Sequence, residues 1–458
     1  MKTKHIILNI TASAMAFAAR SCAGDGYWDA RFGGQGVNGM VNAVAVSGSD
    51  VYVGGSFTRA GSVNATNIAK WNGSNWSALG GGVNNQVYAI AVQGTNVYAG
   101  GKFTAAGGIS VNFIARWNGT SWSALGSGLN NGVSGYVYTL AAPPEGQVGA
   151  YAGGIFGSAI QSNGSLLTVN YITRWNGSSW SALGGGVNST VYGVTVVLND
   201  VYVGGEFTTA NYYSFTNVSD WVTANHIAKW NGSWSALTDI YNRNGVDGYV
   251  NAISVSGSDV YVGGNFRTFN AGGGIATNIA RFGGGPIWRT LGAFTNGVNN
   301  YVTTVELSGT NVYVGGAFTQ AGGTSANRIA RWDGYSWTAL SNGLNSTATA
   351  LGTGDGHVYV GGGFTTAGGK SSEGFAIWHE TPVVRPNLIG IKFNGADCQI
   401  SFTAQVGREY YVERKGNLAA TNWFAFTNVI SGTSGIITVA DPGAANNAAT
   451  RFYRVRSQ

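Results

Sequence analysis

Cysteine, proline and charged residues are all scarce in this chain. It has two cysteines and six prolines among 458 residues, and 10% of its residues are charged, whereas 12% are aromatic and 74 are glycine. A disordered chain would carry more charge and far fewer aromatic residues. The composition therefore excludes extended disorder and fits many short strands joined by tight turns.

Basic runs and long apolar runs are also missing. The formal net charge of +6 is modest for this length, and no run of Lys or Arg is long enough to bind a phosphate backbone. We therefore expect no nucleic-acid partner. Beyond the N-terminal segment, no stretch is apolar for long enough to cross a membrane, so we expect no transmembrane segment.

Histidine is too sparse to suggest a metal centre. Apart from His5, the chain has only His226, His357 and His379, and they are scattered along the sequence. Metal sites need several ligands of suitable type close together. The sequence therefore predicts no metal and no cofactor, and it offers no set of residues that we would assign as catalytic.

The N-terminus has the layout of a signal peptide. Lys2 and Lys4 precede an apolar run from Ile6 to Ala19, and small residues up to Ala23 offer a cleavage site. We predict a signal peptide over residues 1–23 and a secreted or cell-surface protein.

Cys22 leaves lipidation open as an alternative, although Arg20 stands where a lipidation motif needs a small residue. If cleavage follows Ala23, Cys398 is the only cysteine of the mature chain, and no intrachain disulfide can form. Stability must then come from packing.

A repeated glycine motif dominates the rest of the chain. Val-Tyr-x-Gly-Gly-x-Phe, or a close variant, recurs about every fifty residues, a period typical of propeller blades or of a solenoid. The motif tyrosines are Tyr52, Tyr98, Tyr151, Tyr202, Tyr261, Tyr313 and Tyr359.

Each repeat reads as four antiparallel strands. In the second copy the strands are predicted at Val87–Val92, Val97–Phe103, Phe113–Trp117 and Trp122–Leu125. Turn residues separate them, with Asn118-Gly119 opening the tight hairpin before the last strand. Four antiparallel strands per repeat are typical of a propeller blade.

The two ends of the repeat array complement each other. The seventh copy stops at Trp378-His379 without a fourth strand, whereas an unpaired segment, Tyr27–Gly34, matches Asn75–Gly81 of the first copy. A solenoid would instead need capping repeats. We therefore predict a seven-bladed β-propeller over residues 24–380, whose ring is closed by its own N-terminal strand, so that no sheet edge stays open.

A glycine doublet followed by a spaced aromatic pair, here Trp117 and Trp122, resembles the kelch-like and galactose-oxidase-type propellers. The resemblance covers the repeat array, although the hairpin between the aromatic residues is shorter than in the kelch pattern. Galactose oxidase chemistry requires a cysteine crosslinked to a tyrosine inside the propeller, together with histidine ligands. The predicted propeller has no cysteine, so that activity is excluded.

The residues after the array form a different pattern. Residues 381–386 read as a short stiff linker, and alternating stretches over 387–458 predict a small β-sandwich of immunoglobulin or fibronectin type III type. The phrases Glu409–Arg414, Asn422-Trp423 and Arg451–Val455 resemble a C-terminal module of large secreted bacterial proteins. That resemblance implies spacing, anchoring or export rather than chemistry.

Most of the fifteen tryptophans fall at repeat positions, the exceptions being Trp221 and Trp423. Large rigid side chains suit the packing between blades, so we predict a structural role for the repeat tryptophans rather than sugar stacking.

The fourth repeat breaks the pattern with an insertion after its second strand. In a propeller, this loop and the crossover after the fourth strand emerge on the same face, where ligands usually bind. The alternative is that the insertion covers its own blade with apolar side chains. Our candidate ligand-binding residues in the insertion and crossover are Tyr212, Tyr213, Trp221, Tyr241 and Arg243.

A basic residue precedes the third-strand aromatic residue in six repeats. These residues could bind an acidic polysaccharide, or the long aliphatic parts of their side chains could cover the blade edge. They are Lys70, Arg116, Arg174, Lys229, Arg281 and Arg331.

The sequence thus predicts a noncatalytic, monomeric binding protein that recognises carbohydrate or another cell-surface component, such as a protein, through the loop face. A polysaccharide hydrolase or lyase is the alternative, with Glu206 and Glu306 as the carboxylates of interest. A purely structural exoprotein is the third possibility.

Overall fold

In the residues that it describes, the computed structural model is all-β apart from 3-10 residues such as the three-residue 3-10 helix η1 (Arg31–Gly33). It describes residues 26–126, 131–212, 220–267, 276–292, 297–380, 388–394, 397–404, 409–415, 424–430, 435–442 and 452–457. The chain divides into two compact units, Ala23–Pro382 and a second that contains Val383–Gln458. The predicted signal peptide and linker lie outside the described residues.

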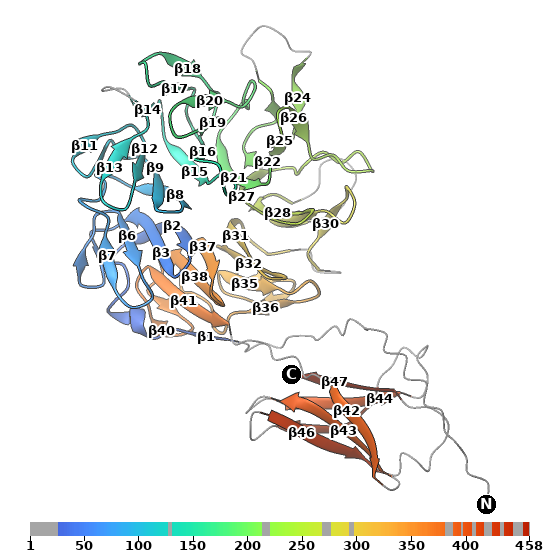
Figure 1. The fold of residues 1–458 in the computed structure, drawn as a ribbon. Helices are drawn as coiled ribbons and strands as arrows, with labels where there is room; N and C mark the ends of the chain where they lie inside the picture. Colours follow the sequence, from blue (N-terminus) through green and yellow to red (C-terminus); the bar gives the residue numbers. More distant parts are fainter. Residues whose placement is uncertain are drawn as a thin grey trace, which may run out of the picture. The chain divides into compact units, whose positions relative to one another are not determined.

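The described part of the first unit contains seven four-stranded antiparallel sheets, which are compatible with propeller blades (Figure 1). The first sheet comprises β2 (Met40–Ser47), β3 (Asp50–Ser56), β6 (Ile68–Trp71) and β7 (Trp76–Ala78). The second comprises β8 (Val87–Gln93), β9 (Asn96–Gly101), β12 (Ile114–Trp117) and β13 (Trp122–Ala124). The third comprises β15 (Val137–Ala141), β16 (Ala150–Gly154), β19 (Ile172–Trp175) and β20 (Trp180–Ala182).

The next three sheets repeat this order. The fourth comprises β21 (Val191–Val197), β22 (Asp200–Gly205), β25 (Ile227–Trp230) and β26 (Trp234–Ala236). The fifth comprises β27 (Tyr249–Ser256), β28 (Asp259–Asn265), β29 (Ile279–Phe282) and β30 (Trp288–Thr290). The sixth comprises β31 (Val302–Ser308), β32 (Asn311–Gly316), β35 (Ile329–Trp332) and β36 (Trp337–Ala339).

The seventh sheet takes its fourth strand from the start of the chain. Its strands are β37 (Ala348–Gly354), β38 (His357–Gly362), β41 (Phe375–Glu380) and β1 (Gly26–Trp28). β1 runs antiparallel to β41, and Trp28 lies opposite Trp378. The N-terminal segment therefore occupies the place that the sequence predicted for it.

Short hairpins follow the second strands of the sheets. They are β4 (Arg59–Ala60) with β5 (Val63–Asn64), β10 (Ala105–Ala106) with β11 (Ile109–Ser110), β23 (Thr209–Ala210) with β24 (Val222–Thr223), β33 (Gln320–Ala321) with β34 (Thr324–Ser325), and β39 (Thr366–Ala367) with β40 (Lys370–Ser371). In the third repeat, β17 (Ser158–Ile160) and β18 (Leu166–Thr168) pair with β14 (Gly132–Val133). Bridges such as Val187 with Ala210 join these hairpins to the preceding crossovers, so both loops leave the sheets on the same side.

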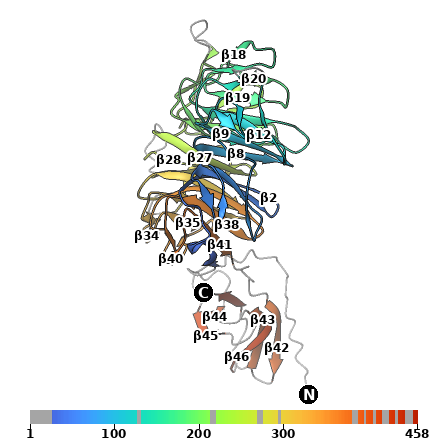
Figure 2. The ribbon, with the colours of Figure 1, turned by 90° about the vertical axis from the view of Figure 1, so that its left-hand side faces the viewer.

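The first strands of successive sheets pack side by side, and they lie toward the inside of the unit (Figure 1). Figure 2 shows the ribbon turned by 90°. β37 of the seventh sheet packs in the same way against β2 of the first. Buried clusters lie between neighbouring sheets. For example, the motif tyrosine Tyr52 packs with Ile90 and Val97 of the second sheet, and Tyr359 packs with residues of the first.

The glycine doublet has two packing roles. A Cβ on Gly54 would lie 2.5 Å from the side chain of Val87 in the next sheet, and a Cβ on Gly55 would lie 1.9 Å from the carbonyl oxygen of Met40 in its own sheet. The first glycine therefore lets neighbouring sheets approach closely. The second lets the strand pass the irregular start of β2, where the register shifts after Val41.

A tryptophan on each fourth strand ties its sheet to the preceding one, and it begins every fourth strand except β1, which it ends. Trp122 donates its indole N–H to the backbone oxygen of Leu79 at 2.8 Å, and Trp28 donates to that of Leu340 at 3.0 Å. A buried N–H group is costly when unpaired, so these bonds help to fix how the sheets dock. As predicted, the repeat tryptophans pack between sheets. The donors are Trp28, Trp76, Trp122, Trp180, Trp234, Trp288 and Trp337.

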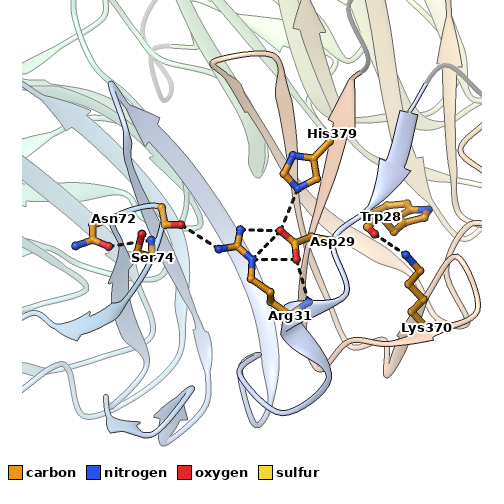
Figure 3. Close-up of polar contacts among 8 residues, drawn as sticks. Trp28, Asp29, Arg31, Asn72, Ser74, Lys370 and His379 are labelled. Carbon is orange, nitrogen blue, oxygen red and sulfur yellow. Dashed lines mark hydrogen bonds and ion pairs between the residues drawn. The ribbon is translucent and has the colours of Figure 1, made fainter. Parts of the chain in front are cut away.

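Polar contacts anchor β1 beside the last strand (Figure 3). The buried carboxylate of Asp29 accepts hydrogen bonds from Arg31, including one from Nη2 at 2.7 Å, and lies 3.0 Å from Nε2 of His379. Arg31 also donates to the backbone oxygen of Gly73 in the first sheet at 3.3 Å. Lys370 donates to the backbone oxygen of Trp28. We call Asp29, Arg31 and His379 the Asp29 clasp.

The second unit contains two three-stranded antiparallel sheets. The first has the order β42 (Leu388–Asn394), β43 (Asp397–Ala404) and β46 (Gly435–Asp441), and the other has the order β45 (Phe424–Ile430), β44 (Glu409–Lys415) and β47 (Phe452–Ser457). Phe402 of β43 and Tyr410 of β44 belong to one buried cluster, with ring centroids 5.4 Å apart. Both sheets therefore contribute to a common core. Within the described residues, no helix is long and apolar enough to span a membrane.

Candidate functional site

The insertion of the fourth repeat brings two of the predicted residues together. The rings of Tyr212 and Trp221 lie 5.1 Å apart beside the β23–β24 hairpin. Tyr212 is tied to the third repeat, because its carbonyl oxygen accepts a hydrogen bond from Asn170 and its N–H donates to Gly186. Trp221 is half-buried, and its indole N–H has no hydrogen-bond partner among the described residues. Tyr213 lies outside the described residues.

The other two predicted residues form a second pair. The guanidinium of Arg243 lies 5.0 Å from the ring centre of Tyr241, which is 65% exposed. Asp239 holds both residues, because it accepts hydrogen bonds from their backbone N–H groups and from Nε of Arg243 at 2.6 Å. Burial opposes ionisation of Asp239, but these bonds outweigh it and lower its pKa.

The two pairs face different neighbours. Tyr212 contacts the third repeat, whereas Arg243 donates to the backbone oxygen of Trp288 in the fifth sheet at 3.2 Å. The proposed grouping of all five residues into one site stays a prediction.

A more continuous cluster lies at the start of the first strands. Tyr88, Tyr138 and Tyr192 occupy the second position of β8, β15 and β21, and each lies where the register of its strand pair shifts. The ring centroids of Tyr88 and Tyr138 are 5.5 Å apart, and those of Tyr138 and Tyr192 are 5.6 Å apart. All three side chains are half-buried. We call these three residues the tyrosine arc.

The same strand position has a purely structural use in the other four sheets. Asn42 donates to the backbone oxygen of Val87 in the next sheet at 3.2 Å, and Asn251 donates likewise to Val302 at 2.8 Å. Thr303 and Thr349 make equivalent bonds to the sheets that follow them. A short polar side chain suffices to bridge two sheets here. The tyrosines depart from this pattern. They place an aromatic ring at a position where a short polar side chain is enough to connect two sheets.

A carboxylate lies at the end of the tyrosine arc. The hydroxyl of Tyr192 donates to Oε1 of Glu206 at 2.7 Å, and Ser189 donates to Oε2 at 3.5 Å. Burial and the neighbouring carboxylate raise the pKa of Tyr192, so its hydroxyl stays protonated and keeps donating. Glu206 directly follows β22, on the side where the loops emerge.

Further aromatic residues flank the arc. Lys102 lies 5.5 Å from the ring centre of Tyr136, just before β15. Beyond the arc, the rings of His226 and Tyr249 are 5.8 Å apart, and Tyr249 is 46% exposed. Burial lowers the pKa of His226, which favours its neutral form.

Sequence reasoning missed the arc. A signal was present, because Tyr follows Val at the start of the first strand in three successive repeats, at Tyr88, Tyr138 and Tyr192. Its meaning depends on the packing of those strands against one another, which no single repeat reveals.

The remaining candidate charges interact mostly within their own sheets. Lys70 pairs with Asp50 at 3.1 Å, and Lys229 with Asp200 at 3.3 Å. These pairs agree with the interpretation that the basic residues cover the sheet edges. Glu306 lies on β31, with Thr353 of the seventh sheet 3.4 Å away. Within the described ranges, no group of three or more His, Cys, Asp or Glu residues could hold a metal ion.

Comparison with known proteins gives no family. No family model matches the chain, and no curated protein matches it. A computationally designed protein, Ika8, is similar over 75% of this chain and 98% of its own, with 17% identity and a TM-score of 0.40. The designed Ika4 protein covers 39% of this chain and 88% of its own, with 19% identity and a TM-score of 0.24. The tricorn protease covers 87% of this chain and 35% of its own, with 9% identity and a TM-score of 0.23.

Proposed function

We propose that this chain is a noncatalytic, secreted or cell-surface carbohydrate-binding protein, built as a seven-bladed β-propeller with a small C-terminal β-sandwich, and that it binds its ligand at the tyrosine arc.

The packing of β37 against β2 supports a closed ring of seven blades. The pairing of β1 with β41 and the indole bond from Trp28 to Leu340 support a closure made by the N-terminal strand. Such a closure leaves the last sheet without an open edge. The core shared by Phe402 and Tyr410 supports a sandwich in the second unit.

The tyrosine arc is the observation that carries the functional proposal. Flat aromatic faces suit the apolar faces of sugar rings, and phenol hydroxyls can bond to sugar hydroxyls. Binding sites combine such apolar surface with a few placed polar groups. Here those groups are the Tyr192 hydroxyl and the Glu206 carboxylate, 2.7 Å apart.

A glycan array tests this proposal. We expect the first unit to bind a defined glycan class, and Tyr138→Ala to weaken that binding about tenfold or more, because Tyr138 contacts both other members of the arc. Tyr335→Ala is the matched control, since Tyr335 is 71% exposed on a distant turn. Melting temperatures of both variants establish that they fold.

Unchanged binding by Tyr138→Ala would remove the arc as the site. Trp221→Ala and Tyr241→Ala belong on the same array, because loss of binding in those variants alone would move the site to the insertion and crossover of the fourth repeat. Absence of any glycan ligand would favour the purely structural alternative.

The hydrolase or lyase alternative is tested through Glu206, because it is the carboxylate that contacts the arc. Release of reducing sugar from a bound glycan, abolished in Glu206→Gln, would replace the noncatalytic proposal.

A further inference from the structure

A separate pocket lies at the outer edge of the first sheet, between the β4–β5 hairpin, the turn before β7 and the segment that follows η1. Its volume is about 360 Å³. The lining residues include Gln35, Arg59, Ser62, Trp71, Asn75 and Trp76. Aromatic, amide, hydroxyl and guanidinium groups thus meet in one cavity.

The aromatic wall carries an unused hydrogen-bond donor. Trp71 and Trp76 lie 5.3 Å apart between ring centroids. The indole N–H of Trp76 donates to the backbone oxygen of Gln35 at 2.7 Å. Trp71 is only 1% exposed, and its indole N–H is buried without a hydrogen-bond partner among the described residues. A buried donor that stays unpaired costs free energy, so the packing around Trp71 is locally suboptimal.

Arg59 supplies a cation at the same pocket. Its side chain is exposed and takes part in none of the ion pairs found among the described residues, whereas nearby Lys70 and Arg31 pair with aspartates. Asn38 fixes its backbone by accepting a hydrogen bond from the Arg59 N–H at 2.8 Å. The corresponding residues in the sequence of the other six repeats are uncharged, namely Ala105, Ser158, Thr209, Thr268, Gln320 and Thr366.

The N-terminal segment makes this junction between two sheets differ from the other six. At those junctions the tryptophan indole donates to a leucine carbonyl, as Trp122 does to Leu79. Here η1 intervenes, and the acceptor is Gln35 instead. Gly34 lines the pocket, and a Cβ built on it would meet no atom within 4 Å. Arg31 braces the opposite side through the backbone of Gly73 (Figure 3).

We propose that this pocket binds an acidic sugar unit, a uronate. Arg59 pairs with its carboxylate, the small exposed part of Trp76 lies against its ring, and Ser62 and Asn75 are available to its hydroxyls. A guanidinium matches a carboxylate in geometry and charge, and a charge-assisted bond contributes more than a neutral one. The inference shares the carbohydrate class with the proposed function but uses different residues, so each can fail separately.

Calorimetric titration of the whole protein with trigalacturonate at low salt, which measures the binding affinity, tests the proposal. We expect saturable binding, at least tenfold weaker binding of neutral trigalactose, and about tenfold or greater weakening by Arg59→Gln. Arg267→Gln is the matched control, because Arg267 is exposed in the equivalent loop of the fifth repeat. Arg59 is a surface residue, so its variant should keep the melting temperature of the wild type.

Equal binding by wild type and Arg59→Gln would overturn the proposal, as would a complete lack of trigalacturonate binding. Tyr138→Ala separates the two sites. We expect it to leave trigalacturonate binding unchanged, whereas loss of that binding would assign the acidic ligand to the tyrosine arc.

Discussion

At the scale of single residues, Glu306 is the most unusual side chain of the inner strands. It lies opposite the motif tyrosine Tyr313, and Thr353 donates a weak hydrogen bond to it at 3.4 Å. Burial raises its pKa from 4.5 to about 7, against the opposing effect of Thr353. The other sheets have small residues at the same position, namely Ala45, Ala91, Ala141, Thr195, Ser254 and Gly352.

This burial predicts a pH-dependent loss of stability. Because the folded pKa lies above the unfolded one, the folded state binds more protons between about pH 4.5 and pH 7, and stability falls as pH rises through that window. Glu306→Gln should abolish this loss and stabilise the first unit at pH 8 by about 1–3 kcal/mol. Urea unfolding at pH 4 and pH 8 measures the effect.

Glu145→Gln is the control, because Glu145 is exposed in a loop. A Glu306→Gln variant with the same pH profile as the wild type would show that Glu306 is solvated when ionised.

At the scale of elements, β1 is a short strand at the edge of the seventh sheet. It has three residues and pairs only along β41 within its sheet. The Asp29 clasp adds polar contacts at its end, and the ring of Tyr27 stacks on that of His379 at 4.6 Å. A short strand held in this way depends strongly on its side-chain anchors.

Asp29→Asn should loosen β1. Burial opposes ionisation of Asp29, but hydrogen bonds from Arg31 and His379 outweigh it and hold its pKa well below the usual range. The stabilisation is therefore fully present above the unfolded pKa of about 4 and is lost as pH falls through the folded pKa. We expect Asp29→Asn to cost about 1–3 kcal/mol at pH 7 and progressively less below pH 4.

Thermal unfolding between pH 2 and pH 7 measures this difference, and the exposed Asp220 provides the control variant Asp220→Asn. A deficit that stays constant down to pH 2 would mean that the ionised carboxylate of Asp29 is not what anchors β1.

At the scale of the whole molecule, the stability of the first unit should depend on both ends of its chain. Trp28 bonds to the sixth repeat at Leu340, while Arg31 bonds to the first at Gly73. The N-terminal segment therefore contacts the sheets on both sides of the seventh. Removing it exposes the edge of β41 and frees the first sheet from its neighbour.

Deletion of residues 26–36 should lower the melting temperature of the whole first unit rather than unfold one sheet. Hydrogen exchange of the deletion variant gives the sharper readout. In a closed ring, protection decreases in the first sheet as well as in the seventh, whereas in an open array it decreases only along β41. Unchanged melting and exchange would contradict closure by the N-terminal strand.

Much of the architecture could be predicted from the sequence, because its determinants are local. Alternating residues and turn signals define four strands per repeat, and the match between Tyr27–Gly34 and Asn75–Gly81 assigns β1 to the last sheet. The burial of the repeat tryptophans could also be predicted, because tryptophan recurs at the same positions of successive repeats. Period and turn chemistry act within one repeat, so they are readable without knowing how repeats pack.

The candidate sites could not be predicted in this way. Sequence reasoning chose Tyr212 and Arg243 because an insertion broke the pattern, but their hydrogen bonds run to the third and fifth repeats respectively. Tyr88, Tyr138 and Tyr192 are about fifty residues apart, and only the packing of β8, β15 and β21 brings their rings together.

The sequence by itself therefore determined the repeat, its strands and the partner of β1, since each depends on short-range patterns of burial and turns. Only the tertiary structure decided that three tyrosines form an arc, and that Arg59 shares a pocket with Trp71 and Trp76. The physical reason is that a binding surface consists of residues from neighbouring sheets, and their juxtaposition is set by sheet docking rather than by any local pattern.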